Sequence, residues 1–224
     1  MLSGKLEYIE RQNIQGKVPE AVIIWLHGLG ADNADFIPLI PELNLAQSVK
    51  FVFPNAPMRP ITINNGYIMR GWYDILDLGG LHSQIDRAGI LDAVEQINAL
   101  IDLQLKAGFS ADKIFLAGFS QGGVISYTTG IMSPHQLGGV LALSCYLPDR
   151  EDLVTRYTLN KSTPIFAAHG TQDNMVPYPA GIHAYQTLKS NGYNISWYEY
   201  PMGHNVCALE IQDMSQWLNR IFSQ

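Results

Sequence analysis

A serine between two glycines is the clearest candidate for a reactive side chain in this sequence. Residues 118–122 read GFSQG, with the apolar run IFLA before them and the small and branched residues GVIS after them. The pattern G-x-S-x-G is typical of a tight, strained turn from a strand into a helix. Glycines suit such a turn because a β-carbon would collide with the neighbouring strand or helix. We expect Ser120 to be a nucleophile, although a glycine-rich turn with an incidental serine gives the same pattern.

A serine hydroxyl is a poor nucleophile at neutral pH, so it needs a histidine base that a carboxylate orients. Where the serine lies in a turn of this kind, from a strand into a helix, the chain order is serine, acid, histidine. His204 follows a late apolar run and a glycine, and we expect it to be the base. His169 ends another apolar run and is a rival, but we expect its ring to pack beneath the acid loop. Asp173 is the predicted acid, with Asp149 and Asp152 in YLPDRED as the fallback.

An acyl-transfer site also needs N–H donors for the carbonyl oxygen that becomes negative, and each donor contributes about 3–4 kcal/mol. The backbone N–H of Gln121, directly after the serine, is one expected donor. The second is expected from HGLG at residues 27–30, where we choose the N–H of Leu29. His27 precedes the serine in the chain, so we expect its ring to brace the loop through a buried hydrogen bond.

The elements that must position these residues alternate along the chain. Six short apolar runs, rich in β-branched residues, begin at Ala21, Val49, Lys113, Gly138, Thr163 and Ile195. Helical periodicity is clearest from Asp86 to about Lys106 and is expected again from about Ala180 to Ser190. A last helix should turn its apolar side inward, with Ile211, Met214, Trp217, Leu218 and Ile221.

This alternation predicts an α/β fold with a mostly parallel sheet and helices on both faces. LEYIERQ, from Leu6, alternates instead and predicts an antiparallel edge strand. Residues 1–224 contain no repeat or linker, so one domain is expected. Ligands of such sheets bind beyond the carboxyl ends of the strands. The loops that hold the serine, the aspartate, the histidine and HGLG should therefore share one rim.

Residues 58–83 form the least periodic segment and contain many apolar side chains. Connections of this length are commonly binding loops or lids, so we expect an apolar flap beside the serine. Each methylene of an acyl chain buried there would contribute about 0.8 kcal/mol. The same side chains could instead pack the flap onto the domain or form a dimer face.

Composition limits the partners and the compartment. The chain has 224 residues, of which 47% are hydrophobic and 15% charged, and its net charge is −6. The sequence shows no basic cluster, which argues against nucleic acid as a partner. No apolar run reaches membrane-spanning length, and the N-terminal residues lack the core of a signal peptide. Two cysteines without metal-binding spacing favour a cytoplasmic protein with free thiols.

Several longer motifs resemble the phospholipase/carboxylesterase family, which includes acyl-protein thioesterases and bacterial carboxylesterases. These motifs are HGLGAD, RGWYDI, GFSQGG, LALSCYLP, HGTQDNMVP and GHNV, in this order. The resemblance implies the α/β-hydrolase fold, a Ser120–His204–Asp173 triad and oxyanion donors at Leu29 and Gln121. Where the family often has an acidic residue and a serine, this chain has Thr171 and Asn205.

The resemblance also implies a substrate class. Members hydrolyse carboxylic esters, and some act on thioester-linked fatty acyl groups or lysophospholipids. We expect short-to-medium acyl esters, of small molecules, lipids or acylated proteins, and no metal or organic cofactor. The expected substrate-binding residues are Ile68, Met69, Trp72, Tyr73, Leu76 and Val176.

Other classes stay open. A peptidase or a dienelactone-type hydrolase would share the fold, and a non-catalytic interaction module would also be compatible with it. The flap could contact membrane surfaces transiently, and the chain could be a monomer or a homodimer.

Overall fold

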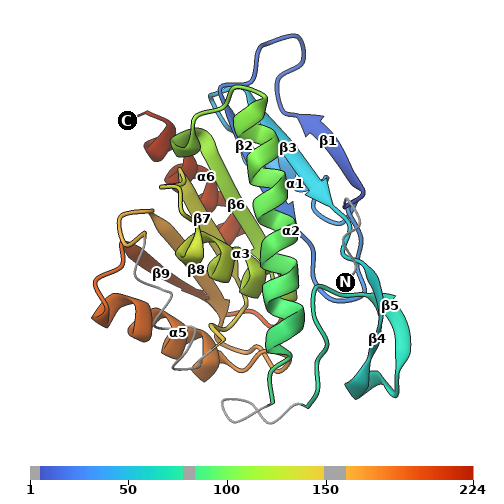
Figure 1. Ribbon diagram of the computed structural model, residues 1–224. Helices are drawn as coiled ribbons and strands as arrows, with labels where there is room; N and C mark the ends of the chain where they lie inside the picture. The colour runs from blue at the N-terminus through green and yellow to red at the C-terminus, as the bar shows by residue number, and fades with distance from the viewer. Residues whose placement is uncertain (1–5, 78–83, 149–159, 224) are drawn as a thin grey trace.

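A mostly parallel sheet organises the computed structural model, which describes residues 6–77, 84–148 and 160–223 (Figure 1). The strand order is β1-β3-β2-β6-β7-β8-β9. The strands are β1 (Tyr8–Gln12), β2 (Ala21–Leu26), β3 (Val49–Pro54), β6 (Ile114–Phe119), β7 (Gly139–Leu143), β8 (Ile165–Gly170) and β9 (Ile195–Tyr200). Only β1 is antiparallel to its neighbour, and it lies at the edge. The predicted α/β fold and the predicted edge strand are confirmed.

Helices cover both faces of this sheet. One face carries α2 (Arg87–Lys106), α3 (Gln121–Met132) and α5 (Tyr178–Ser190), and the other carries α1 (Leu39–Glu42) and α6 (Ala208–Phe222). Strand side chains alternate between the two cores, as in β2, where Val22 and Ile24 face one core and Ile23 and Trp25 the other. Burial of both faces explains why these strands are almost continuously apolar.

The helices lie close to their predicted positions. Helix α2 begins after Asp86, whose carboxylate accepts a hydrogen bond from the Gly89 N–H at 2.9 Å and so caps the first turn. Helix α6 buries Met214, Trp217 and Leu218, while its other two predicted core residues are half-buried against the same cluster.

The segment expected to be an irregular flap contains a β-hairpin of β4 (Met58–Ile61) and β5 (Tyr67–Arg70), which stands apart from the main sheet (Figure 1). Asn65 and Gly66 turn the chain with φ of 54° and 76°. An Asn-Gly pair is a recognised hairpin signal, so the hairpin has a local cause in the sequence. Residues 78–83 of the expected flap lie outside the described residues. Within the described ranges, no helix is long and apolar enough to cross a bilayer.

Candidate active site

Ser120 occupies the turn between β6 and α3 with φ 55° and ψ −121°, a strained backbone conformation for a residue with a side chain. Its N–H donates to the Leu143 carbonyl at 2.9 Å, which ties the turn to β7. A β-carbon on Gly118 would overlap the carbonyl of Gly122, and one on Gly122 would lie 2.6 Å from the His27 carbonyl oxygen. The two glycines therefore let α3 start against the sheet.

The structure brings the serine, the histidine and the aspartate together. His204 Nε2 lies 2.9 Å from Ser120 Oγ, and His204 Nδ1 lies 2.7 Å from Asp173 Oδ2. Ser120 follows β6, Asp173 follows β8 and His204 follows β9, so the carboxyl ends of three parallel strands supply the three residues. The side chain of Asp173 is fully buried, whereas 18% of the His204 side chain is exposed. Water can thus reach the imidazole but not the carboxylate.

The loop after β8, here called the acid loop, also holds the other carboxylate oxygen of Asp173. Its Oδ1 accepts hydrogen bonds from the N–H groups of Met175 and Val176, each at 2.9 Å. These bonds leave Oδ2 directed at the histidine ring. The fallback acids, Asp149 and Asp152, lie outside the described residues.

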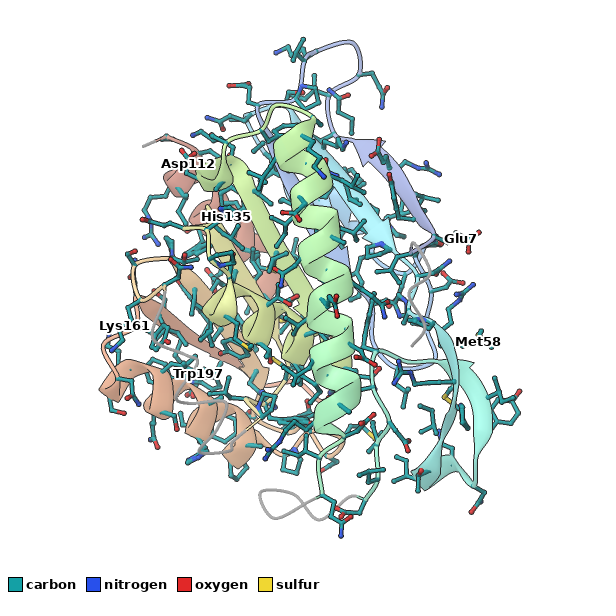
Figure 2. All side chains as sticks on the ribbon, in the orientation of Figure 1. Glu7, Met58, Asp112, His135, Lys161 and Trp197 are labelled. Carbon is teal, nitrogen blue, oxygen red and sulfur yellow. The ribbon has the colours of Figure 1, made fainter. Side chains whose placement is uncertain are left out.

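His169 lies beneath this loop, at the position expected for it. The side chain is 1% exposed, and burial lowers the pKa of His169. Its Nε2 lies 2.9 Å from the Val176 carbonyl oxygen, a group that can only accept, so the ring proton is on Nε2. The ring also packs against Trp197 of β9, which lies beside α5 (Figure 2).

The loop after β2 lies directly against the serine. A β-carbon on Gly28 would be 3.6 Å from Ser120 Cβ. Leu29 comes next in this loop, and Gln121 is the first residue of α3, where N–H groups have no partner in the helix. Across the three described ranges, neither Leu29 nor Gln121 donates its backbone N–H to another group. Both amides are therefore unpaired within these ranges, as a predicted oxyanion donor must be.

The His27 ring braces this loop. Its Nε2 accepts a hydrogen bond from the Ala56 N–H at 3.0 Å, so the proton is on Nδ1, which donates to the Gly28 carbonyl at 2.7 Å. The ring is neutral because Nε2 accepts a hydrogen bond, and burial lowers the pKa of His27 in agreement with this. In a trans peptide the N–H points opposite to the preceding carbonyl. Fixing the Gly28 carbonyl thus fixes the direction of the Leu29 N–H.

Two of the expected substrate-binding residues are placed differently from the expectation. Trp72 and Tyr73 are 0% and 2% exposed, so their rings fill the interior rather than a groove surface. The Tyr73 hydroxyl is hydrogen-bonded to that of Tyr146 at 2.9 Å. Packing beneath the hairpin, which periodicity does not reveal, explains the difference.

The other four expected substrate-binding residues are accessible. Ile68 is 60% exposed on β5, while Met69, Leu76 and Val176 are half-buried. The sulfur of Met69 would lie 3.6 Å from a β-carbon on Gly30, so the hairpin reaches the loop that carries the expected oxyanion donor.

Comparison with known proteins decides the family. The family model described as Phospholipase/Carboxylesterase matches residues 11–222. The chain belongs to this family. Acyl-protein thioesterase 1 of Emericella nidulans is 40% identical to this family member over 217 residues, which cover 90% of each chain. Carboxylesterase SOBER1 of Arabidopsis thaliana is 34% identical, over 88% of this chain and 89% of the relative.

Solved structures agree with the sequence comparison. The crystal structure of Arabidopsis thaliana SOBER1 has a TM-score of 0.86 and 32% identity, and the match covers 90% of this chain and 99% of that chain. This member of the phospholipase/carboxylesterase family is therefore an α/β-hydrolase and a serine esterase-like hydrolase.

Proposed function

We propose that the chain hydrolyses carboxylic esters, with Ser120 as nucleophile, His204 as general base and acid, and Asp173 as the group that orients the histidine. The observation that carries the proposal is that one imidazole ring contacts both other side chains, through Nε2 and Nδ1. Because an ionised carboxylate only accepts hydrogen bonds, Asp173 keeps the ring proton on Nδ1 and leaves the Nε2 lone pair facing the hydroxyl.

The reaction then has two stages. Ser120 Oγ bonds to the acyl carbon while His204 Nε2 takes its proton, and the N–H groups of Leu29 and Gln121 stabilise the oxyanion. His204 gives the proton to the leaving alcohol or thiol, which leaves an acyl-enzyme. Water, deprotonated by the same nitrogen, attacks the acyl carbon. The bond from this carbon to Ser120 Oγ then breaks, His204 returns the proton to Oγ, and the carboxylic acid is released. None of these steps uses a metal or an organic cofactor.

We propose short-to-medium acyl esters as substrates, with acyl thioesters, acylated proteins and lysophospholipids as further candidates. Relatives named acyl-protein thioesterase and carboxylesterase support this class. We propose that an acyl chain binds accessible apolar side chains, namely Ile68, Met69, Leu76 and Val176. The position of Met69 beside Gly30 supports a path from the hairpin to the oxyanion loop.

The hairpin is also our candidate for transient contact with a lipid surface. Met58, Tyr67 and Ile68 are 56%, 69% and 60% exposed, and Met58 lies at the start of β4 (Figure 2). The strand register places Met58 and Ile68 on the same face of the hairpin, and exposed apolar residues that share a face are typical of interaction sites. Flotation with neutral phosphatidylcholine vesicles should recover the protein only in part. Concentration-dependent sedimentation without vesicle binding would instead assign the hairpin to a homodimer.

The test of the proposed function is Ser120→Ala measured on p-nitrophenyl esters from acetate to palmitate. Turnover should fall by about 10⁴-fold or more, with the thermal midpoint little changed, and labelling by a fluorophosphonate should disappear. Activity retained in this variant would point to another nucleophile. A chain-length profile that is flat in kcat/KM would contradict the proposed acyl preference.

The same measurements separate the alternatives. A peptidase or a dienelactone-type hydrolase would label with the fluorophosphonate but would favour amide or lactone substrates over the esters. A non-catalytic interaction module would not label at all. We also propose that residues 1–224 form one domain and that the protein is cytoplasmic, which its free cysteines, Cys145 and Cys207, support.

A further inference from the structure

Trp72 makes two hydrogen bonds that the proposed mechanism does not use. It lies two residues after the end of β5 and is completely buried. Its backbone N–H donates to the Gln121 side-chain oxygen Oε1 at 2.8 Å, and its indole Nε1–H donates to the His27 carbonyl at 2.9 Å. The rings of Trp72 and His27 are also in contact, with centroids 5.4 Å apart. Trp72 thus bonds both to the loop after β2, which carries the proposed donor Leu29, and to the first residue of α3, the proposed donor Gln121.

On the α3 side, the bond to Trp72 restrains the residue that offers one donor. The Gln121 side chain is held at both of its polar atoms, since Nε2 donates to the Tyr73 carbonyl at 2.7 Å. Gln121 is 3% exposed, so water does not compete for these bonds. Because both ends of the Gln121 amide group are held, the Gln121 backbone cannot rotate freely, and the direction of its N–H at the start of α3 is restricted.

On the β2 side, the Trp72 indole holds the peptide group between His27 and Gly28, which precedes the one that offers the Leu29 N–H. The His27 carbonyl lies between the Trp72 Nε1–H and the start of α3, where a β-carbon on Gly122 would come within 2.6 Å of it. The next carbonyl, of Gly28, is held by the His27 ring. The peptide groups between His27 and Gly28 and between Gly28 and Leu29 are therefore both fixed, and the second contains the Leu29 N–H.

We propose that Trp72 is a positioning residue that sets the distance between the two oxyanion donors. The inference rests on the proposed function, because it requires Leu29 and Gln121 to be those donors. Donors stabilise an oxyanion well only at about 2.7–3.1 Å from it. A displacement of about 1 Å can reduce the rate by roughly 100-fold. A single rigid link between the two loops suits that tolerance.

The same link couples the hairpin to the oxyanion site. Arg70 ends β5 and its carbonyl accepts a hydrogen bond from the Gly30 N–H at 2.8 Å, while the Gly71 N–H donates to the Pro57 carbonyl at 3.1 Å. Trp72 comes next in the chain. An acyl chain seated against the hairpin would therefore act on the Leu29 loop through the Arg70–Gly30 bond and on both donors through Trp72. Trp72 would then determine turnover rather than affinity.

The test is Trp72→Phe, which keeps a ring and the backbone N–H but removes the indole donor. The matched control is Trp25→Phe, because Trp25 is 2% exposed in β2 and its Nε1 has no hydrogen-bond partner among the described residues. For Trp72→Phe we expect kcat to fall by about tenfold or more with KM within about twofold. Affinity for a trifluoromethyl ketone, whose adduct carries an oxyanion, should fall by the same factor as kcat/KM. The control should change neither quantity.

A kcat and a ketone affinity at the wild-type level in folded Trp72→Phe would overturn the inference. If that variant does not fold, the same comparison is made on Gln121→Met, which removes the acceptor for the Trp72 N–H, and the same result overturns it. Ser120→Ala keeps the two questions separate. If its activity is lost while Trp72→Phe behaves as wild type, the proposed function stands and the positioning role of Trp72 does not.

Discussion

His169 of β8 faces Asp173 in the loop that follows this strand, with His169 Nε2 3.5 Å from Asp173 Oδ2. Burial lowers the pKa of His169, and the ring directs its Nε2–H at the Val176 carbonyl. The N–H of Val176 donates in turn to Asp173 Oδ1. His169 and the aspartate therefore hold the two peptide groups on either side of the Val176 α-carbon, which fixes the turn that carries Asp173.

His169→Leu should weaken this turn, because it leaves the partly buried Val176 carbonyl without its donor. We expect a loss of about 1–3 kcal/mol in the free energy of unfolding, measured by urea denaturation, together with a lower kcat/KM. His169→Gln is the matched control, because its amide nitrogen can occupy the place of Nε2, and it should retain more of both quantities. Equal effects of the two variants would contradict the role of the N–H.

Asp173→Asn should reduce kcat/KM by about 10³–10⁴-fold. The amide oxygen would stay with the N–H groups of Met175 and Val176, which places the NH₂ group against His204 Nδ1. Nδ1 would then have to accept, and the proton would move to Nε2, where it prevents uptake of the Ser120 proton. Steady-state kinetics measure the loss. Activity within about tenfold of the wild type would show that the histidine does not depend on this carboxylate.

Gly122→Ala should destabilise the protein by about 3 kcal/mol or more. Its β-carbon would overlap the Leu26 carbonyl and lie 2.6 Å from the His27 carbonyl oxygen, and backbone atoms in a central strand cannot yield easily. Gly203→Ala is the control, because its β-carbon would come no closer than 3.8 Å to the Gln172 carbonyl oxygen. Thermal unfolding of both variants decides this, and similar midpoints would refute the packing argument.

Glu210 makes stability depend on pH. It is 0% exposed in the first turn of α6, and burial raises its pKa to about 8, with a lowering contribution from the Cys207 backbone and a raising one from Asp213. The folded state therefore binds the proton more tightly than the unfolded state, whose carboxyl has an ordinary pKa near 4.5. The contribution of Glu210 to stability is complete below about pH 4.5 and is lost as the pH rises through about 8.

Glu210→Gln should remove this dependence. We expect the variant to match the wild type near pH 4.5 and to exceed its free energy of unfolding by about 2–4 kcal/mol near pH 9. Denaturation at a series of pH values measures the difference, with the exposed Glu42→Gln in α1 as the control. A wild-type protein whose stability does not fall between these pH values would contradict the buried, protonated carboxyl.

The sequence contained good information on features that depend on neighbouring residues. The strand of residues 114–119 is readable because a strand with helices on both faces must be apolar along its whole length. The turn at Ser120 is readable because two glycines flank it, which the close approach of α3 requires. The hairpin β4–β5 was also readable, from Asn65 and Gly66, but the apolar residues around them suggested an irregular flap instead.

Features that depend on partners distant in the chain were not readable. Trp72 was expected in a substrate groove, yet its acceptor on Gln121 lies 49 residues away and draws it into the interior. Glu210 is at a helix start, where a carboxylate commonly faces water, and only the packing of α6 buries it.

The sequence by itself thus determined the fold class, the nucleophile turn and the identity of Ser120, Asp173 and His204 as candidates, because glycine sterics, strand burial and chain order act locally or follow from the architecture. Only the tertiary structure decided that His204 lies 2.9 Å from a serine 84 residues earlier in the chain. It also decided which N–H each buried ring offers and which side chains leave the surface, because hydrogen-bond partners and burial are set by contacts between elements.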